Sequence, residues 1–373
     1  MNSLKLAVFT PVYPSPERPK GNIFVKSRVD EYAKKGYHIT AFGYGPQNRS
    51  FQMDGIQVYE GSWDYVSTQL DQYPFDRFLV HLIDRRVALY ILKNRCFHKC
   101  ILWIHGFEAL GWYRDVLHWK FSFSFFKQRL IRAFRNMLEL ATFRYLIFRS
   151  QGQIKYIFVS KWMRQMAQID LLYPFSDYKI IPNPIDTRFF DYQIKPAEQR
   201  LKILFIRAYN HPKYAADLAL QSILEFSKHP FFSKFEFFIA GGECHQLVSS
   251  LESFPNVTIR NGFLNHDEMK ALCHQYGVYL CPSRQDAQGV SMCEAMSCGM
   301  LVIGSQTTAI PEFVKHMETG ILTRSVQDIV QAYIQLYEKP DQFQKFSESA
   351  AKWIRENIDM PKLIQQELDE IIK

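Results

Sequence analysis

Residues 282–299 read Pro282-Ser283-Arg284-Gln285-Asp286-Ala287-Gln288-Gly289-Val290-Ser291-Met292-Cys293-Glu294-Ala295-Met296-Ser297-Cys298-Gly299. The stretch lies between two short apolar runs, 278–281 and 301–304, each of which is typical of a buried strand. A polar loop opens the stretch, and a short helix is expected to follow and to end at Gly299, because glycine is favoured just past a helix C-terminus. Strand, loop, helix and strand form a βαβ unit, in which ligands bind at the carboxyl ends of the strands.

The chemistry of this loop suits a nucleotide sugar. A helix N-terminus offers unpaired N–H groups and the positive end of a dipole, and both favour a phosphate. Asp286 lies in the loop and Glu294 on the expected helix, and a carboxylate can accept hydrogen bonds from two sugar hydroxyls at once. Two other interpretations stay open on these residues alone. Ser291-x-x-Glu294 is also the pattern of a capping box, and Asp286 could be a solvated loop residue.

The stretch resembles the donor-site motif of the retaining glycosyltransferases of family 4 (glycosyl transferases group 1), which have the GT-B fold. Their motif is an acidic residue, seven others, then Glu, Ala, Met, two small residues and Gly, and here it runs from Asp286 to Gly299. The first acidic residue is usually Glu, and Ala287-Gln288-Gly289 replaces the usual Gly-Phe-Gly. The resemblance implies that Asp286 contacts the donor sugar as a catalytic residue and that Glu294 contacts the ribose. It implies further donor contacts at Gln288, Gly289, Val290 and Ser291.

The start of the chain alternates strand and helix, which is typical of a doubly wound domain. We expect a strand at 5–10, a helix at 24–35 and a strand at 38–42. The loop before the helix contains one glycine, Gly21, so it is not the Gly-x-Gly-x-x-Gly fingerprint of dinucleotide binding. In the resembling family this loop reaches toward the acceptor and the donor phosphates, and we assign Gly21 to it.

A histidine follows the apolar strand expected at 101–104. His105 therefore falls at the carboxyl end of a strand, where ligands bind, although a single histidine is more often a packing residue. The resemblance implies that His105 faces the reacting sugar as a donor-sugar or acceptor contact. Glu108 is a further candidate.

The second half of the chain carries two cations after its first expected strand, 201–206. Arg207 and Lys213 can clamp a diphosphate and stabilise its leaving charge, or they can be two exposed basic residues. The resembling family has Gly-Arg and Lys-Gly here, so both cations match while both glycines are absent. The resemblance also implies that a loop near residue 263 lies against the nucleotide base, and we assign Phe263 and Leu264 to it.

Segment 118–155 combines basic and aromatic residues. It holds eight Lys or Arg, one acidic residue, and nine aromatics. This pattern predicts a surface that meets anionic lipid head groups. The alternative is an ordinary amphipathic helix whose aromatics are core and whose cations face water. The net charge of +8 fits either an anionic membrane or an anionic polymer as partner.

Composition fits a globular protein of two domains. The chain has 373 residues, of which 47% are hydrophobic, and seven cysteines without metal-like or paired spacing. We interpret the cysteines as reduced thiols. No signal peptide and no apolar stretch of membrane-spanning length is recognised, so we expect a cytoplasmic protein that is peripheral on the inner face of the cell membrane.

Together these observations predict an α/β protein of the GT-B fold, with two Rossmann-like doubly wound domains facing a central cleft. Residues 1–185 would bind the acceptor, residues 186–357 would bind the nucleotide sugar, and a helix at 358–373 would pack back on the first domain. The expected function is transfer of a sugar, with retention, from a nucleotide diphosphate sugar to a hydroxyl of a cell-surface glycan. We expect no metal, no other cofactor and no nucleic-acid partner. The alternatives are a nucleotide-sugar epimerase of the same fold and a non-catalytic membrane or polyanion binder.

Overall fold

The computed structural model of the protein describes residues 4–19, 21–116, 126–207, 211–242, 248–262 and 264–373. The chain divides into two compact units, which are described separately. The first unit holds the described residues of Met1–Val116, Phe121–Asn183 and Leu363–Lys373, and the second those of Pro184–Lys362. The last helix thus contributes residues 363–372 to the unit that the N-terminus begins.

The first unit is built on an eight-stranded sheet in the order β3-β4-β2-β1-β5-β6-β7-β8. All neighbouring strands are parallel except β3 and β4, which pair antiparallel. The strands are β1 (Lys5–Phe9), β2 (His38–Tyr44), β3 (Arg49–Met53), β4 (Ile56–Gly61), β5 (Arg77–His81), β6 (Cys100–Ile104), β7 (Lys155–Phe158) and β8 (Lys179–Ile180). The helices are α1 (Ile23–Lys34), α2 (Trp63–Gln72), α3 (Arg85–Asn94), α4 (Tyr113–Val116), α5 (Phe126–Ser150), α6 (Lys161–Asp170) and α14 (Met360–Ile372).

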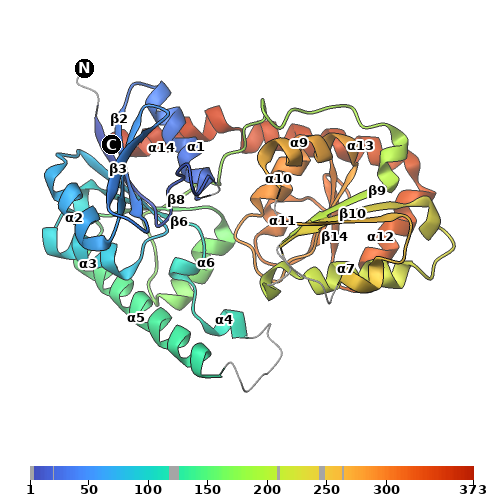
Figure 1. Ribbon diagram of the computed structural model, residues 1–373, viewed down its shortest axis with the longest axis horizontal. Helices are drawn as coiled ribbons and strands as arrows, with labels where there is room; N and C mark the ends of the chain where they lie inside the picture. The colour runs from blue at the N-terminus through green and yellow to red at the C-terminus, as the bar shows by residue number, and fades with distance from the viewer. Residues whose placement is uncertain (1–3, 20, 117–125, 208–210, 243–247, 263) are drawn as a thin grey trace. The chain divides into compact units, whose positions relative to one another are not determined.

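The second unit is built on a six-stranded, fully parallel sheet in the order β11-β10-β9-β12-β13-β14. In Figure 1, α7 and α12 lie on one side of this sheet, while α9, α10 and α13 lie on the other. The strands are β9 (Lys202–Ile206), β10 (Glu236–Gly241), β11 (Val257–Asn261), β12 (Val278–Cys281), β13 (Leu301–Ser305) and β14 (Gly320–Thr323). The helices are α7 (Ala216–Phe226), α9 (His266–Gln275), α10 (Val290–Ser297), α11 (Ile310–Phe313), α12 (Val326–Glu338) and α13 (Pro340–Asn357).

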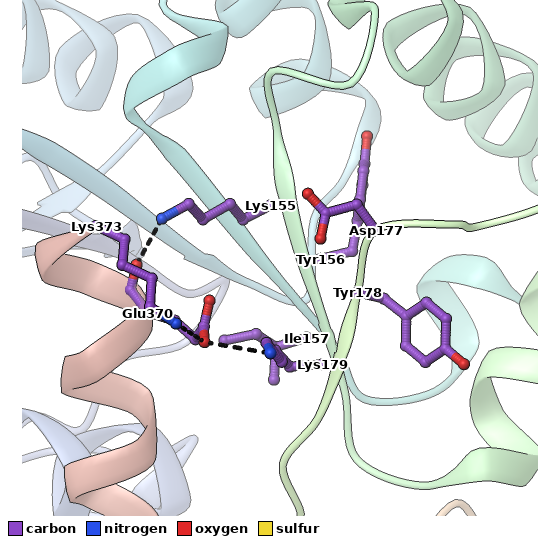
Figure 2. Close-up of a pocket in the computed structure, with 8 residues that line it drawn as sticks. All are labelled: Lys155, Tyr156, Ile157, Asp177, Tyr178, Lys179, Glu370 and Lys373. Atoms are coloured by element: carbon purple, nitrogen blue, oxygen red, sulfur yellow. Dashed lines mark hydrogen bonds and ion pairs between the residues drawn. The ribbon is translucent and has the colours of Figure 1, made fainter.

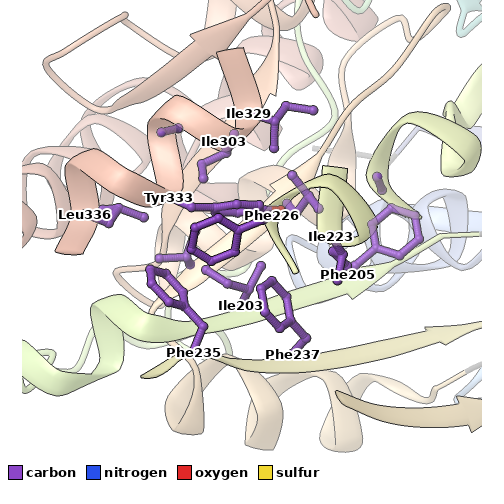
Figure 3. Packing of buried hydrophobic residues seen from close by; sticks show 14 of the residues in the cluster. Ile203, Phe205, Ile223, Phe226, Phe235, Phe237, Ile303, Ile329, Tyr333 and Leu336 are labelled. Atoms are coloured by element: carbon purple, nitrogen blue, oxygen red, sulfur yellow. The ribbon is translucent and has the colours of Figure 1, made fainter. Parts of the chain in front are cut away.

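The core of the second unit lies where α7 and α12 cover the sheet (Figure 3). Phe226 is fully buried and packs on Phe235 and Tyr333, with ring centroids 4.9 and 5.1 Å away. Each buried aromatic side chain removes a large apolar surface from water, about 150–250 Å². This core fixes the strands whose carboxyl ends carry the predicted donor site.

Each sheet has one place where the strand order reverses. In the second sheet β9 lies between β10 and β12, so the chain continues from β9 toward one edge of the sheet and from β12 toward the other. In the first sheet β1 lies between β2 and β5. Ligands of doubly wound sheets bind at such points, outside the carboxyl ends of the strands. The parallel two-unit architecture confirms the predicted fold class.

Candidate active site

Helix α10 starts at the strand reversal of the second sheet. Its N-cap is Gly289, with left-handed backbone at φ 76°, and no side chain caps the helix. The first N–H groups of a helix have no partner within the helix, so they are available to a ligand. Ser291 lies inside the helix and its hydroxyl lies 3.2 Å from the Tyr279 hydroxyl, which can donate to it. The capping-box interpretation of Ser291 and Glu294 is therefore wrong.

Asp286 holds the loop that precedes α10. Its Oδ1 accepts hydrogen bonds from the N–H groups of Gln288 and Gly289, at 3.1 and 2.7 Å. Its Oδ2 lies 3.4 Å from Arg207 Nη2. With its side chain only 15% exposed, Asp286 is not a solvated loop residue. One oxygen of the carboxylate thus shapes the loop. A sugar hydroxyl that bonded to Asp286 would share the carboxylate with these main-chain N–H groups.

Glu294 lies on the first two turns of α10 with a side chain that is 12% exposed. Burial raises the pKa of its carboxyl to about 7, and the charge of Arg207 acts in the opposite direction. Within the described part of the chain, its nearest basic group is His266 Nε2 at 3.9 Å, and burial lowers the pKa of that imidazole. A carboxylate in this setting gains from hydroxyl donors of a ligand, because water and cations do not satisfy it fully.

Arg207 follows β9 and points across the strand reversal. Its Nη2 donates to Cys281 Sγ at 2.7 Å and lies 3.4 Å from Asp286, and its guanidinium lies over the Tyr214 ring at 5.2 Å from the centroid. The side chain is 9% exposed. Arg207 is therefore held in place, and the interpretation as an exposed basic residue does not apply to it.

Lys213 lies in the same loop, within a short 3₁₀ turn, Pro212–Tyr214. Its Nζ lies over the Tyr214 ring at 4.8 Å from the centroid, so one aromatic ring contacts both cations. Its main-chain carbonyl accepts hydrogen bonds from the N–H groups of Arg284 and Gln285, at 2.8 and 3.2 Å. The loop after β9 is thereby tied to the loop after β12.

In the first unit, His105 directly follows β6 and is partly exposed. The buried carboxylate of Glu108 accepts hydrogen bonds from the main-chain N–H groups of His105 and Gly106. Burial raises the pKa of Glu108 to about 7. Glu108 therefore shapes the turn that presents His105. The Phe24 ring and the imidazole pack in a T-shaped contact, with centroids 4.9 Å apart.

Gly21 lies where the loop after β1 folds back on itself. A Cβ atom there would lie 2.9 Å from the Val12 carbonyl oxygen and 3.0 Å from Pro14 N. Such distances are too short for a side chain, so the loop requires glycine at this position for its packing. Nothing in this geometry bears on an acceptor, and the assignment of Gly21 to the acceptor loop stays a prediction.

The remaining assigned residues occupy the same edge of the second sheet or lie outside the described residues. Gln288 is buried and Val290 is the first residue of α10. Leu264 follows β11 and is partly exposed. Phe263 lies outside the described residues. The structure thus brings Arg207, Lys213, Asp286 and Glu294 to one edge of one sheet, whereas their roles toward a ligand stay predictions.

Three residues at these sites were not anticipated. Tyr214 contacts both cations, Cys281 accepts from Arg207, and His81 at the end of β5 lies against His105. His81 carried a usable signal, because it follows an apolar run just as His105 does. Cys281 and Tyr214 carried none, since their roles depend on contacts between different loops.

A pocket of about 300 Å³ lies at the opposite edge of the first sheet, by the amino ends of β7 and β8. Figure 2 shows Lys155, Lys179 and Lys373 directed at Glu370. Lys155 Nζ donates to the Glu370 carbonyl at 2.8 Å, and the Glu370 carboxylate lies 3.7 Å from Lys179 and 2.7 Å from Lys373. Lys155 and Lys179 fasten the last helix to the sheet, Lys373 pairs with Glu370 three residues before it, and none of the three forms part of the candidate active site.

Comparisons with known proteins agree with this arrangement. Residues 200–339 match the family model described as glycosyl transferases group 1. The serotype-specific mannosyltransferase WbdA of Escherichia coli is 34% identical over 71 residues, which are 19% of this chain and 9% of that protein. The matched segment thus spans under a tenth of that relative.

Solved structures match over almost the whole chain. Sucrose-phosphate synthase from Thermosynechococcus elongatus has a TM-score of 0.73 at 13% identity, covering 98% of both chains. Anabaena Alr3699/HepE, solved with UDP and glucose, has a TM-score of 0.70 at 13% identity, covering 99% of both. The fold is that of GT-B glycosyltransferases. The match at residues 200–339 and the fold confirm the resemblance to glycosyl transferases group 1, and the assignment to family 4 stays a prediction.

Proposed function

We propose that the protein is a retaining glycosyltransferase of family 4, which moves a sugar from a nucleotide diphosphate sugar to a hydroxyl of a cell-surface glycan. One observation carries the proposal. At the strand reversal of the second sheet, an uncapped helix N-terminus, a held arginine and a poorly satisfied buried carboxylate lie together. Phosphates, a departing diphosphate and sugar hydroxyls are the groups that these three features favour.

In the proposed reaction the bond between the sugar anomeric carbon and the diphosphate oxygen breaks. The acceptor oxygen forms a bond to the same carbon, and its proton passes to the leaving phosphate. Arg207, Lys213 and the first N–H groups of α10 stabilise the charge that develops on the diphosphate. We propose that these groups suffice without a metal, and that Glu294 holds the ribose.

The test is a screen of UDP and GDP sugars by thermal shift, followed by transfer assays with the donors that stabilise the protein. Transfer to a glycan acceptor is the expected result. Isomerised sugar without transfer would instead establish an epimerase. Binding of no nucleotide sugar, together with the absence of donor hydrolysis, would contradict the proposal and favour a non-catalytic binder.

Helix α5 supports a second part of the proposal, contact with an anionic membrane. Its buried residues, among them Phe143, Leu146 and Ile147, form one face that packs on the protein. The opposite face carries exposed apolar side chains that extend over about 27 Å of helix, from residue 130 to residue 148. The exposed members are Leu130, Ile131, Phe134, Met137, Leu138, Tyr145 and Phe148. The interpretation of all the aromatics as core therefore fails for Phe134, Tyr145 and Phe148.

Arginines flank the exposed stripe. Arg132, Arg135, Arg144 and Arg149 are all exposed, whereas the helix carries one acidic residue, Glu139. An apolar stripe flanked by cations is the pattern of helices that lie in a bilayer interface. Among the described residues, no helix is long and apolar enough to cross a bilayer. We therefore propose that α5 lies flat on an anionic membrane.

Co-sedimentation with vesicles tests this part. Wild type should bind anionic vesicles at low salt, and replacement of Arg132, Arg135, Arg144 and Arg149 by Ser should release it, since each cation contributes about 1 kcal/mol near such a surface. A control with equal loss of charge replaces Lys34, Arg188, Lys228 and Lys352, each of which is at least 66% exposed. Wild type that stays in the supernatant, or a control that is released equally, would contradict the helix-specific contact.

A further inference from the structure

His266 opens helix α9 beside Glu294, at the edge of the second sheet where α10 also begins. The helix follows β11, so its start lies at the carboxyl end of that strand. A capping box closes this start, because the Glu268 N–H donates to Asn265 Oδ1 and the Asn265 N–H donates to the Glu268 carboxylate, both at 2.8 Å. The main chain that carries His266 is thereby fixed on both sides.

Aromatic side chains hold the His266 ring while leaving it accessible. The ring packs against Phe190 in a T-shaped contact, with centroids 5.8 Å apart, and the Phe189 centroid lies 6.3 Å away. The main-chain carbonyl of Phe190 accepts a hydrogen bond from Ser297 Oγ on α10 at 2.6 Å, so this contact is itself tied to the helix that carries Glu294. The His266 side chain is 49% exposed, and a ligand can therefore reach the imidazole.

The distance between the imidazole and the Glu294 carboxylate suits one bridging hydroxyl. His266 Nε2 lies 3.9 Å from Glu294 Oε1, which is too far for a direct hydrogen bond. An oxygen atom between the two groups could lie within hydrogen-bond distance of both, since a hydroxyl donates one hydrogen bond and also accepts. Burial lowers the pKa of His266 and favours the neutral imidazole, which carries one N–H and one acceptor nitrogen.

We propose that His266 binds the donor together with Glu294, the two side chains sharing one hydroxyl of the nucleotide ribose, and that this pair selects ribonucleotides over deoxyribonucleotides. The inference rests on the proposed function, in which Glu294 holds the ribose, and it adds a second residue to that contact. One carboxylate oxygen shares its hydroxyl with His266, and the other oxygen is left for the adjacent hydroxyl. A nucleotide that lacks the shared hydroxyl leaves both side chains without their partner, and sites built to bond a hydroxyl reject such analogues.

The experiment measures by calorimetry the affinity of the full chain for UDP, GDP and their 2′-deoxy and 3′-deoxy forms. His266→Phe keeps a ring against Phe190 but cannot form the hydrogen bond. We expect this variant to bind the preferred ribonucleotide about tenfold more weakly than wild type, as for one lost hydrogen bond. Its affinity for the deoxy form that lacks the shared hydroxyl should equal that of wild type. His266→Gln retains a side-chain N–H and should recover most of the affinity for the ribonucleotide.

His274→Ala, roughly two turns further along α9, is the matched control. His274 Nε2 lies 3.2 Å from the Asp191 carbonyl oxygen, so this change should lower Tm and leave the preference for ribose over deoxyribose as in wild type.

Two results would overturn the proposal alone: a His266→Phe protein with wild-type affinity for the ribonucleotide, or one with equal losses for the ribonucleotide and both deoxy forms. Wild type that binds neither UDP nor GDP would overturn it together with the proposed function. If the nucleotides bind with the expected pattern but no sugar is transferred, the proposed function fails and the role of His266 stands.

Discussion

At the scale of single residues, Glu294 separates a binding role from a structural one. If its carboxylate accepts hydrogen bonds from the donor, Glu294→Gln should weaken donor affinity by one to two decades, since a hydrogen bond to a charged group contributes roughly 1.5–3 kcal/mol. Affinity is measured by calorimetry with the donor that the thermal-shift screen identifies. Unchanged affinity would remove Glu294 from the site.

The pH dependence of stability provides the control for Glu294→Gln. Burial raises the carboxyl pKa from 4.5 to about 7 in the folded protein, so the folded state binds more protons than the unfolded state between these values. Stability of the free protein therefore falls as pH rises from about 4.5 to 7. Gln cannot ionise, so the variant should lose less stability over this range in denaturant titrations. A variant that is less stable at pH 8 than wild type would indicate a structural role.

Lys213 permits a cleaner test of the cation clamp than Arg207. Its structural hydrogen bonds use its main-chain carbonyl, whereas the side chain of Arg207 is itself bonded to Cys281 and Asp286. Lys213→Met should therefore keep the fold and lower turnover by about two to three decades, by analogy with other groups that stabilise developing charge. Tm is measured alongside turnover. Turnover like that of wild type would exclude Lys213 from the clamp.

At the scale of elements, the sequence patterns predicted the strands and helices that depend on neighbouring residues. The expected strand at 278–281 is β12, and the expected helix at 24–35 is α1 at Ile23–Lys34, because apolar runs and flanking glycines act within a few residues. The start of α10 was left open between two interpretations. The structure decides it because Gly289 adopts the left-handed backbone that places Ser291 inside the helix. Residues that meet through different loops, such as Arg207 and Cys281, leave no such pattern.

Helix α10 should be sensitive at its first turn. Gly289 has φ 76°, so Gly289→Ala forces a left-handed conformation that costs about 1 kcal/mol and also meets Ile310 Cδ1 at 3.3 Å. We expect a lower Tm and weaker donor binding, because the N–H groups of the turn shift. Gly36→Ala is the matched control, with φ 89° and open space around it, and should lower Tm alone. Equal loss of affinity in both variants would contradict a phosphate site at α10.

At the scale of the whole molecule, the fold depends on contacts between the two ends of the sequence. Glu367 on α14 is fully buried and accepts from Arg28 Nε at 2.9 Å, from Trp103 Nε1 at 3.3 Å and from the Tyr32 hydroxyl. Arg28 and Glu367 are 339 residues apart in sequence. No periodicity of the sequence indicates such a pair. The sequence could therefore predict that the last helix returns to the first domain, but not which side chains bind it there.

Removing one partner of this pair should destabilise the first unit strongly. Glu367→Ala leaves the buried Arg28 guanidinium without its carboxylate partner, which costs about 3–5 kcal/mol. Hydrogen exchange should show faster opening of β1, β5 and β6, while amides of β9 and β12 keep their protection, because all three partners of Glu367 belong to the first unit. The double change Arg28→Met and Glu367→Leu replaces the pair by apolar groups and should recover most of the loss. Failure of the double variant to recover stability, or equal loss of protection in both units, would contradict this account of how the last helix is held.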